Sequence, residues 1–213
     1  MNIEIKDASK EIRKMKILDH VNLSMSGGHI YGLQGPNGSG KTMLLRLIAG
    51  LIRPTTGEVL IDGKPLGCDM DFPNSLGVLI ENSEFLPGYT GIENLKLIAS
   101  IRGTTNIMRI RNTLVRVGLN PDDTRKFRKF SLGMKQRLGI AAAIMETPDL
   151  ILLDEPTNAL DEDGIMQICS LLQQERERGA LIILACHDAA ILRDLADIVY
   201  SISNGTVKEL KAE

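Results

Sequence analysis

One octapeptide of the 213-residue sequence reads Gly35-Pro36-Asn37-Gly38-Ser39-Gly40-Lys41-Thr42. It matches G-x-x-x-x-G-K-[ST], the pattern of a glycine-rich loop that binds nucleotide phosphates. The glycines let consecutive backbone N–H groups face a di- or triphosphate, and the helix that follows adds the positive end of its dipole. In this pattern Lys41 contacts the β- and γ-phosphates, and the hydroxyl group of Thr42 coordinates Mg²⁺. We therefore predict that these eight residues form a nucleotide-binding loop.

The rest of the chain predicts the fold around this loop. Strand patterns occur at residues 2–5, 21–25, 30–33, 58–61, 76–80, 150–153, 180–185, 198–202 and 206–210. Helical patterns occur at residues 41–51, around 92–99, 107–117 and 138–145, and at 162–178 and 189–195. Short apolar strands between helices imply a parallel sheet that is covered on both faces. We predict an α/β fold of the P-loop NTPase type, with a mainly parallel sheet core, an antiparallel N-terminal β portion and an inserted helical subdomain.

A second motif follows one of these strands. The apolar residues 150–153 lead directly into Asp154 and Glu155, and Pro156 then stops further strand pairing. Asp154, at the end of the strand, is placed to hold Mg²⁺ through its water shell. Glu155, one residue further on, is placed beside the γ-phosphate as the base or orienter of the attacking water. Together with the phosphate loop, this acidic pair predicts a nucleoside triphosphatase site.

The composition limits the kinds of partner. Lysine and arginine number 25 against 27 acidic residues, which gives a net charge of -2, and aromatic residues make up 3% of the chain. A nucleic-acid partner is not expected, because both an overall positive charge and a supply of stacking aromatic side chains are missing. The longest runs without polar side chains have eight residues, whereas a transmembrane helix needs about 20. The N-terminus has no apolar stretch like that of a secretory signal, so we expect a cytoplasmic protein.

Three further segments extend the pattern. Residues 130–137 read Phe-Ser-Leu-Gly-Met-Lys-Gln-Arg and resemble the signature sequence of the ATP-binding cassette (ABC) family. Residues 158–161 resemble the D-loop of this family, and His187 falls at the position of its switch histidine. With the two motifs above, the chain resembles the ABC nucleotide-binding domain over essentially its whole length. The resemblance implies one domain, residues 1–213, in which residues 1–86 and 147–213 form an ATP-binding core lobe and residues 87–146 a helical lobe.

The resemblance also implies a mechanism. Members of the family bind two ATP molecules, with Mg²⁺, between two such domains arranged head to tail, as a homodimer or an ABC heterodimer. Ser131 and Gly133 would then contact the γ-phosphate held by Lys41 of the other subunit. His187 would contact the γ-phosphate and help to hold the attacking water, and Asp161 would cross the interface. This chain would contact the membrane only through a separate transmembrane permease subunit, and it would lie at the inner face of the cell membrane.

The sequence departs from the family pattern at three positions. Glu81 stands where the family usually has a glutamine after a strand; its carboxylate can ligate Mg²⁺ or accept from the catalytic water, but it cannot donate as an amide does. Glu81 is therefore a candidate catalytic residue and metal ligand. Leu132 replaces the first signature glycine, which would be strained if that position needs a positive φ. Ile12 occupies the position where the family often has an aromatic residue that stacks on adenine.

These observations leave three functions to weigh. We predict the cytoplasmic ATPase subunit of an ABC exporter, and Glu81 with the stretch that follows resembles the ATPases of lantibiotic-immunity and related peptide-antibiotic exporters. Residues 82–91 are expected to face the permease. The alternatives are a soluble, non-transport ABC ATPase that remodels a macromolecular complex, and a P-loop kinase or GTPase, which would leave the signature segment and His187 unexplained.

Overall fold

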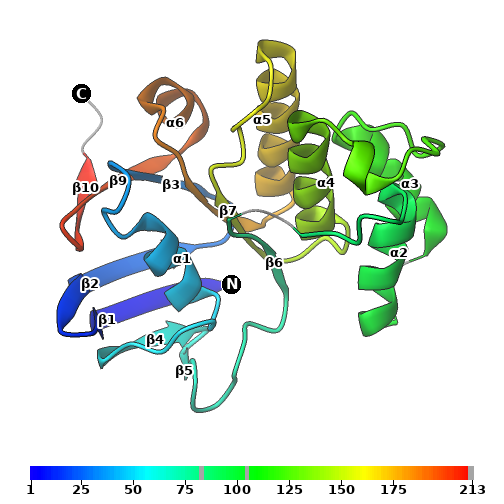
Figure 1. The fold of residues 1–213 in the computed structure, drawn as a ribbon. Helices are drawn as coiled ribbons and strands as arrows, with labels where there is room; N and C mark the ends of the chain where they lie inside the picture. The colour runs from blue at the N-terminus through cyan, green and yellow to red at the C-terminus, as the bar shows by residue number, and fades with distance from the viewer. Residues whose placement is uncertain (82–83, 104–105, 211–213) are drawn as a thin grey trace.

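The computed structural model describes residues 1–81, 84–103 and 106–210, with the side chain of residue 102 excepted (Figure 1). The strands are β1 (Asn2–Ile12), β2 (Met15–Ser26), β3 (Ile30–Gln34), β4 (Thr56–Ile61), β5 (Lys64–Pro65), β6 (Leu76–Leu79), β7 (Leu150–Asp154), β8 (Leu181–Ala185), β9 (Ile198–Ser203) and β10 (Thr206–Leu210). The helices are α1 (Lys41–Ile48), α2 (Gly91–Arg102), α3 (Ile107–Arg116), α4 (Leu132–Ile144), α5 (Glu162–Glu177) and α6 (Ala189–Leu195), with the short 3₁₀ helix η1 (Phe127–Lys129).

The strands form two sheets. The larger sheet has the order β10-β9-β3-β8-β7-β6, in which all neighbours pair parallel except β9 and β10. The smaller sheet has the order β2-β1-β4-β5 and is antiparallel throughout. The predicted α/β class, with a mainly parallel core and an antiparallel N-terminal portion, is confirmed.

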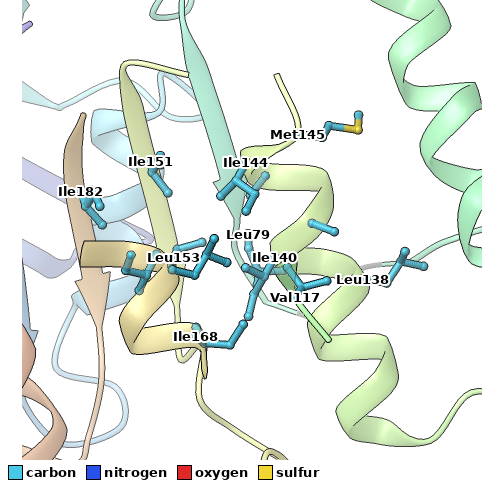
Figure 2. Close-up of a cluster of buried hydrophobic side chains, with 14 of the residues drawn as sticks. Leu79, Val117, Leu138, Ile140, Ile144, Met145, Ile151, Leu153, Ile168 and Ile182 are labelled. Atoms are coloured by element: carbon cyan, nitrogen blue, oxygen red, sulfur yellow. The ribbon is translucent and has the colours of Figure 1, made fainter. Parts of the chain in front are cut away.

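Each face of the larger sheet is covered by its own hydrophobic cluster. Strand β7 shows why, because its fully buried residues alternate between the two: Leu150 and Leu152 pack toward α1 and the smaller sheet, and Ile151 and Leu153 pack toward α4 and α5. Figure 2 shows the second cluster, in which Ile151 and Leu153 lie near side chains of α4 and α5. Because both faces of this strand are buried, neither face has a solvent-exposed position for a polar side chain, which explains the continuous apolar run at residues 150–153.

The helices α2, α3 and α4 are inserted between β6 and β7 and lie on one side of the molecule (Figure 1). Helix α2 begins with a capping box, in which the Thr90 hydroxyl accepts from the backbone of Glu93 and the Glu93 carboxylate accepts from the backbone of Thr90. Over the described residues, no helix is long and apolar enough to cross a membrane.

The parallel pairing places the candidate site residues at one edge of the sheet. Strands β3, β6, β7 and β8 all end at this edge, because the carboxyl ends of parallel strands lie together. The phosphate loop follows β3, Glu81 follows β6, Asp154 and Glu155 close β7, and His187 follows β8. The topology therefore brings together groups from four distant parts of the sequence.

Candidate nucleotide-binding site

The phosphate loop needs its glycines for two different reasons. Gly38 and Gly40 have φ values of 78° and 113°, which residues with a β-carbon rarely adopt. Gly35 instead needs space, because a β-carbon there would lie 2.3 Å from the carbonyl oxygen of Ile202 and 2.8 Å from the Ser39 hydroxyl. Gly40 then forms the N-cap of α1, so the loop runs directly into the positive end of the helix dipole.

Two groups of the loop have the properties expected of phosphate ligands. Lys41 is only 6% exposed, and its ammonium group donates to the carbonyl oxygens of Gly35, at 2.6 Å, and Pro36, at 3.2 Å. The Ser39 hydroxyl oxygen is buried and has no hydrogen-bond partner in the described part of the chain. A buried polar atom without a partner is costly. The backbone of the loop therefore surrounds a positively charged ammonium group and a hydroxyl group without a partner, and both are suitable ligands for the phosphates of a nucleotide.

Thr42 and Asp154 form a pair that fits Mg²⁺. The Thr42 hydroxyl donates to Asp154 Oδ2 at 2.6 Å, although the two residues are 112 positions apart. Burial raises the pKa of the Asp154 carboxyl group, against the hydrogen bond from Thr42 that lowers it, and the nearby charge of Glu155 adds to the increase. A hydroxyl and a nearly buried carboxylate are hard oxygen donors of the kind that Mg²⁺ prefers.

Glu155 is held in an unusual backbone conformation. Its φ is 50°, in the left-handed region, which costs a residue with a side chain about 1–2 kcal/mol. Its backbone N–H donates to the carbonyl oxygen of Ala185 at 2.8 Å, which anchors it beside β8. The carboxylate oxygen Oε2 lies 2.8 Å from Nδ1 of His187. The structure thus joins the two residues that the sequence proposed as base and switch histidine.

The loop and the acidic pair line one open cavity of about 350 Å³. Its lining residues are Ile17, Asn37, Gly38, Gly40, Lys41, Thr42, Met43, Asp154 and Glu155. Ile17 and Met43 supply the larger apolar side chains of this lining, and Ile12, which the family pattern places at adenine, is not among the lining residues. Ile17 was not a predicted site residue: it lies in β2 just after the β1–β2 turn, before the strand pattern that the sequence shows at residues 21–25.

Several predicted site residues lie outside this cavity. Glu81 makes an ion pair with Arg46 of α1, with 2.8 Å between its Oε2 and Nη2 of the arginine. The Ser131 hydroxyl caps α4 by accepting from the backbone of Met134 at 3.2 Å, and Asp161 caps α5 by accepting from Gly164 at 3.0 Å. These residues are exposed and free to meet a second molecule, but in one copy they are helix caps or ion-pair partners.

The signature segment shows how the chain tolerates its departure from the family pattern. Leu132 is the first residue of α4, its φ is not positive, and its side chain is 67% exposed. The strain that a positive φ would have caused is therefore absent at this described position. Gly133, by contrast, must be small, because a β-carbon there would lie 2.8 Å from the carbonyl oxygen of Ala159.

A phosphate loop, an oxygen pair for a divalent cation and an acid next to a histidine, all at the carboxyl edge of a parallel sheet, define a P-loop nucleotide-hydrolysing domain. The chain belongs to the ABC transporter family, because the family model of that description matches residues 18–158. It is 46% identical over 206 residues to the uncharacterized ABC transporter ATP-binding protein YybJ of Bacillus subtilis (strain 168), covering 97% of this chain and 94% of the relative.

Two further comparisons agree with this assignment. The chain is 33% identical over 205 residues to the lantibiotic transport ATP-binding protein SrtF of Streptococcus pyogenes, covering 96% of this chain and 88% of the relative. It is 27% identical to the ATP-binding cassette MJ0796, solved as a dimer in a post-hydrolysis state bound to ADP and Pi, with a TM-score of 0.86 and coverage of 99% and 100%. The chain is therefore an ABC transporter ATPase, as the sequence predicted, and the remodelling ATPase and the kinase or GTPase are not supported.

Proposed function

We propose that two ABC subunits, two copies of this chain or this chain with a related one, close head to tail over two ATP molecules. The observation that carries the proposal is the incompleteness of the site in one copy. The cavity is lined by the phosphate loop and the acidic pair, whereas Ser131 and Gly133 begin a different helix and do not line it. Both would complete the site from the facing subunit, where a hydroxyl and an N-terminal N–H group suit the γ-phosphate. The dimeric structure of MJ0796 bound to ADP and Pi supports the pairing of two such subunits.

Within each site the roles follow from the contacts. All residues from Gly35 to Thr42 wrap the phosphates, and Lys41 exchanges its two loop carbonyl contacts for the β- and γ-phosphates. Thr42 and Asp154 hold Mg²⁺, which when bound neutralises charge on the phosphate oxygens. Glu81 would approach the metal or the catalytic water from its position beside Arg46, with which one of its carboxylate oxygens forms an ion pair.

Hydrolysis needs a base that accepts a proton from water. Glu155 fits this role because its carboxylate borders the cavity and is only partly exposed. His187 is 2.8 Å from that carboxylate, so it can orient Glu155 and reach the γ-phosphate from the same side. Asp161, which is exposed at the start of α5, would cross the interface to the other subunit.

ATP turnover would drive export of a peptide antibiotic or drug through a separate transmembrane permease at the inner face of the cell membrane. The relative SrtF, named for lantibiotic transport, supports the substrate class. The predicted permease contact, residues 82–91, includes two positions outside the described residues. Its described part carries the exposed apolar side chains of Leu86 and Tyr89, and α2 adds Leu97 and Ile101.

The substitution Glu155→Gln tests the proposal. It keeps the size of the side chain but removes the base, so we expect ATP turnover to fall at least about 100-fold while ATP binding persists. The variant should also accumulate an ATP-dependent dimer, measured by size-exclusion chromatography with light scattering. Glu177→Gln is the matched control, because Glu177 is exposed and is the last residue of α5. Normal turnover by Glu155→Gln would refute the role of the base, and an ATP-bound monomer would refute the composite site.

A further inference from the structure

The helix that carries the signature segment also touches the backbone of the base in the same chain. The side-chain amide of Gln136, on α4, donates to the carbonyl oxygen of Glu155 at 3.0 Å. This contact joins residues 19 positions apart, on two different elements. The same carbonyl oxygen accepts from the backbone N–H of Asn158 at 3.2 Å, which closes the turn after β7. The bond from Asn158 lies within the turn and does not connect it to another element. The bond from Gln136 therefore holds the turn in place relative to α4.

The conformation of Glu155 makes this contact important. A left-handed φ of 50° persists in a residue with a side chain only when surrounding contacts hold it. One such contact is the bond from the Glu155 N–H to Ala185, and the others are the two bonds to its carbonyl oxygen. Rotation about this residue would move the carboxylate away from His187 and from the cavity.

Helix α4 also contacts later residues of the segment that follows β7. The close approach of Gly133 to the carbonyl oxygen of Ala159 leaves no room for a side chain, and Ala159 itself has a φ of 63°. Arg137, next to Gln136, donates to the side chain of Gln167 at 2.6 Å and lies 3.7 Å from the carboxylate of Asp161. The first turns of α4 thus contact the beginning, middle and end of the segment 155–161.

We propose that Gln136 is a positioning residue for hydrolysis: it ties the main chain of Glu155 to the helix whose N-terminus meets the nucleotide of the facing subunit. This inference rests on the proposed role of Glu155 as the base. Gln136 does not touch the nucleotide, so it acts on the rate of the chemical step through Glu155 and leaves nucleotide binding alone. The docking of α4 and the alignment of the base are thereby coupled within one chain.

The test uses the full chain with Gln136→Met, which keeps the length of the side chain and removes the donor. We expect kcat to fall about tenfold, because small displacements of a catalytic group have effects of this size or larger. The affinity for ADP, measured by titration calorimetry, should change less than about twofold. Gln136→Glu, which also lacks a donor when ionised, should show the same loss. Gln173→Met is the matched control, because the side chain of this glutamine of α5 is exposed and makes no hydrogen bond to the described part of the chain.

A double-mutant cycle separates positioning from a structural effect. In the Glu155→Gln background, Gln136→Met should lower the residual single-turnover rate less than about twofold, because the group through which it acts is gone. A full tenfold loss in that background, or unchanged kcat in both Gln136 variants, would overturn the proposal. If Gln136→Met does not fold, Gln136→Glu carries the same cycle. Normal turnover by Glu155→Gln alone would instead refute the base assignment.

Discussion

Glu175 is a buried carboxylate that joins the inserted helices to the core, and its loss has a calculable effect on stability. It is 2% exposed and accepts from Arg116 at the end of α3, at 2.7 Å, and from Arg178 just after α5, at 2.8 Å. Arg178 also donates to the carbonyl oxygen of Pro148 at 2.6 Å. The substitution Glu175→Ala therefore removes the acceptor from two guanidinium groups that belong to different parts of the fold.

The magnitude follows from the number of bonds and their exposure. A hydrogen bond to a charged group contributes about 1.5–3 kcal/mol, so two bonds set an upper range of about 3–6 kcal/mol. The lower end of this range applies, because the side chains of Arg116 and Arg178 are 34% and 30% exposed and can form hydrogen bonds with water once the carboxylate is removed. We expect the free energy of unfolding to fall by about 3 kcal/mol, in line with breaking a buried ion pair. For a domain of this size, that lowers the melting temperature by about 6–12 °C.

Urea unfolding followed by circular dichroism and by intrinsic tyrosine fluorescence measures this change. Glu177→Ala, at an exposed position two residues further along α5, should change the free energy of unfolding by less than about 0.5 kcal/mol. A loss below about 1 kcal/mol for Glu175→Ala would show that the two ion pairs contribute little beyond their desolvation cost, and would refute the reasoning.

Two further predictions concern the site. Gly35→Ala should weaken ADP binding at least about tenfold, since its new β-carbon would meet the carbonyl oxygen of Ile202, whereas Gly88→Ala has open space and serves as the control in the same titration. Arg46→Met should lower ATP turnover several-fold, because it leaves the charge of Glu81 unbalanced near the triphosphate, and adding Glu81→Gln should restore it. Equal loss with and without Glu81→Gln would show that Arg46 does not act through this carboxylate.

The sequence predicts the existence of the strands and helices better than the residues at which they begin and end. The pattern predicts a strand only at residues 2–5, whereas β1 runs to Ile12. Residues 6–12 lose the alternation of polar and apolar residues, and the register of the strand is irregular after Ile5, near Asp7, where φ is 49°. The third inserted helix was predicted from Leu138, yet α4 begins at Leu132. Its first two turns are half-exposed, so the apolar run marks only the buried half of the helix.

The core strands and the phosphate loop were predictable because local sequence determines them. Residues 150–153 are buried on both faces, so burial alone selects apolar side chains at every position. The pairing of Glu81 with Arg46 was not predictable, because it joins the segment after β6 to α1, and neither residue carries a motif that points to the other. Its consequence is physical: the negative charge that distinguishes this chain from the family pattern has a nearby counter-charge.

Glu155 shows how a motif and a fold contribute different information to one site. The order of strand, aspartate and glutamate indicates which carboxylate can act as the base, but a left-handed φ of 50° cannot be inferred from that order. That conformation depends on contacts from β8 and α4, through Ala185 and Gln136. Glu155 is therefore positioned by two elements that lie on opposite sides of it in the sequence, one next to His187 and the other next to Ser131. A shift of either element would change the direction of the carboxylate, so in the proposed dimer ATP hydrolysis would depend on the docking of α4, the helix that begins at the signature segment.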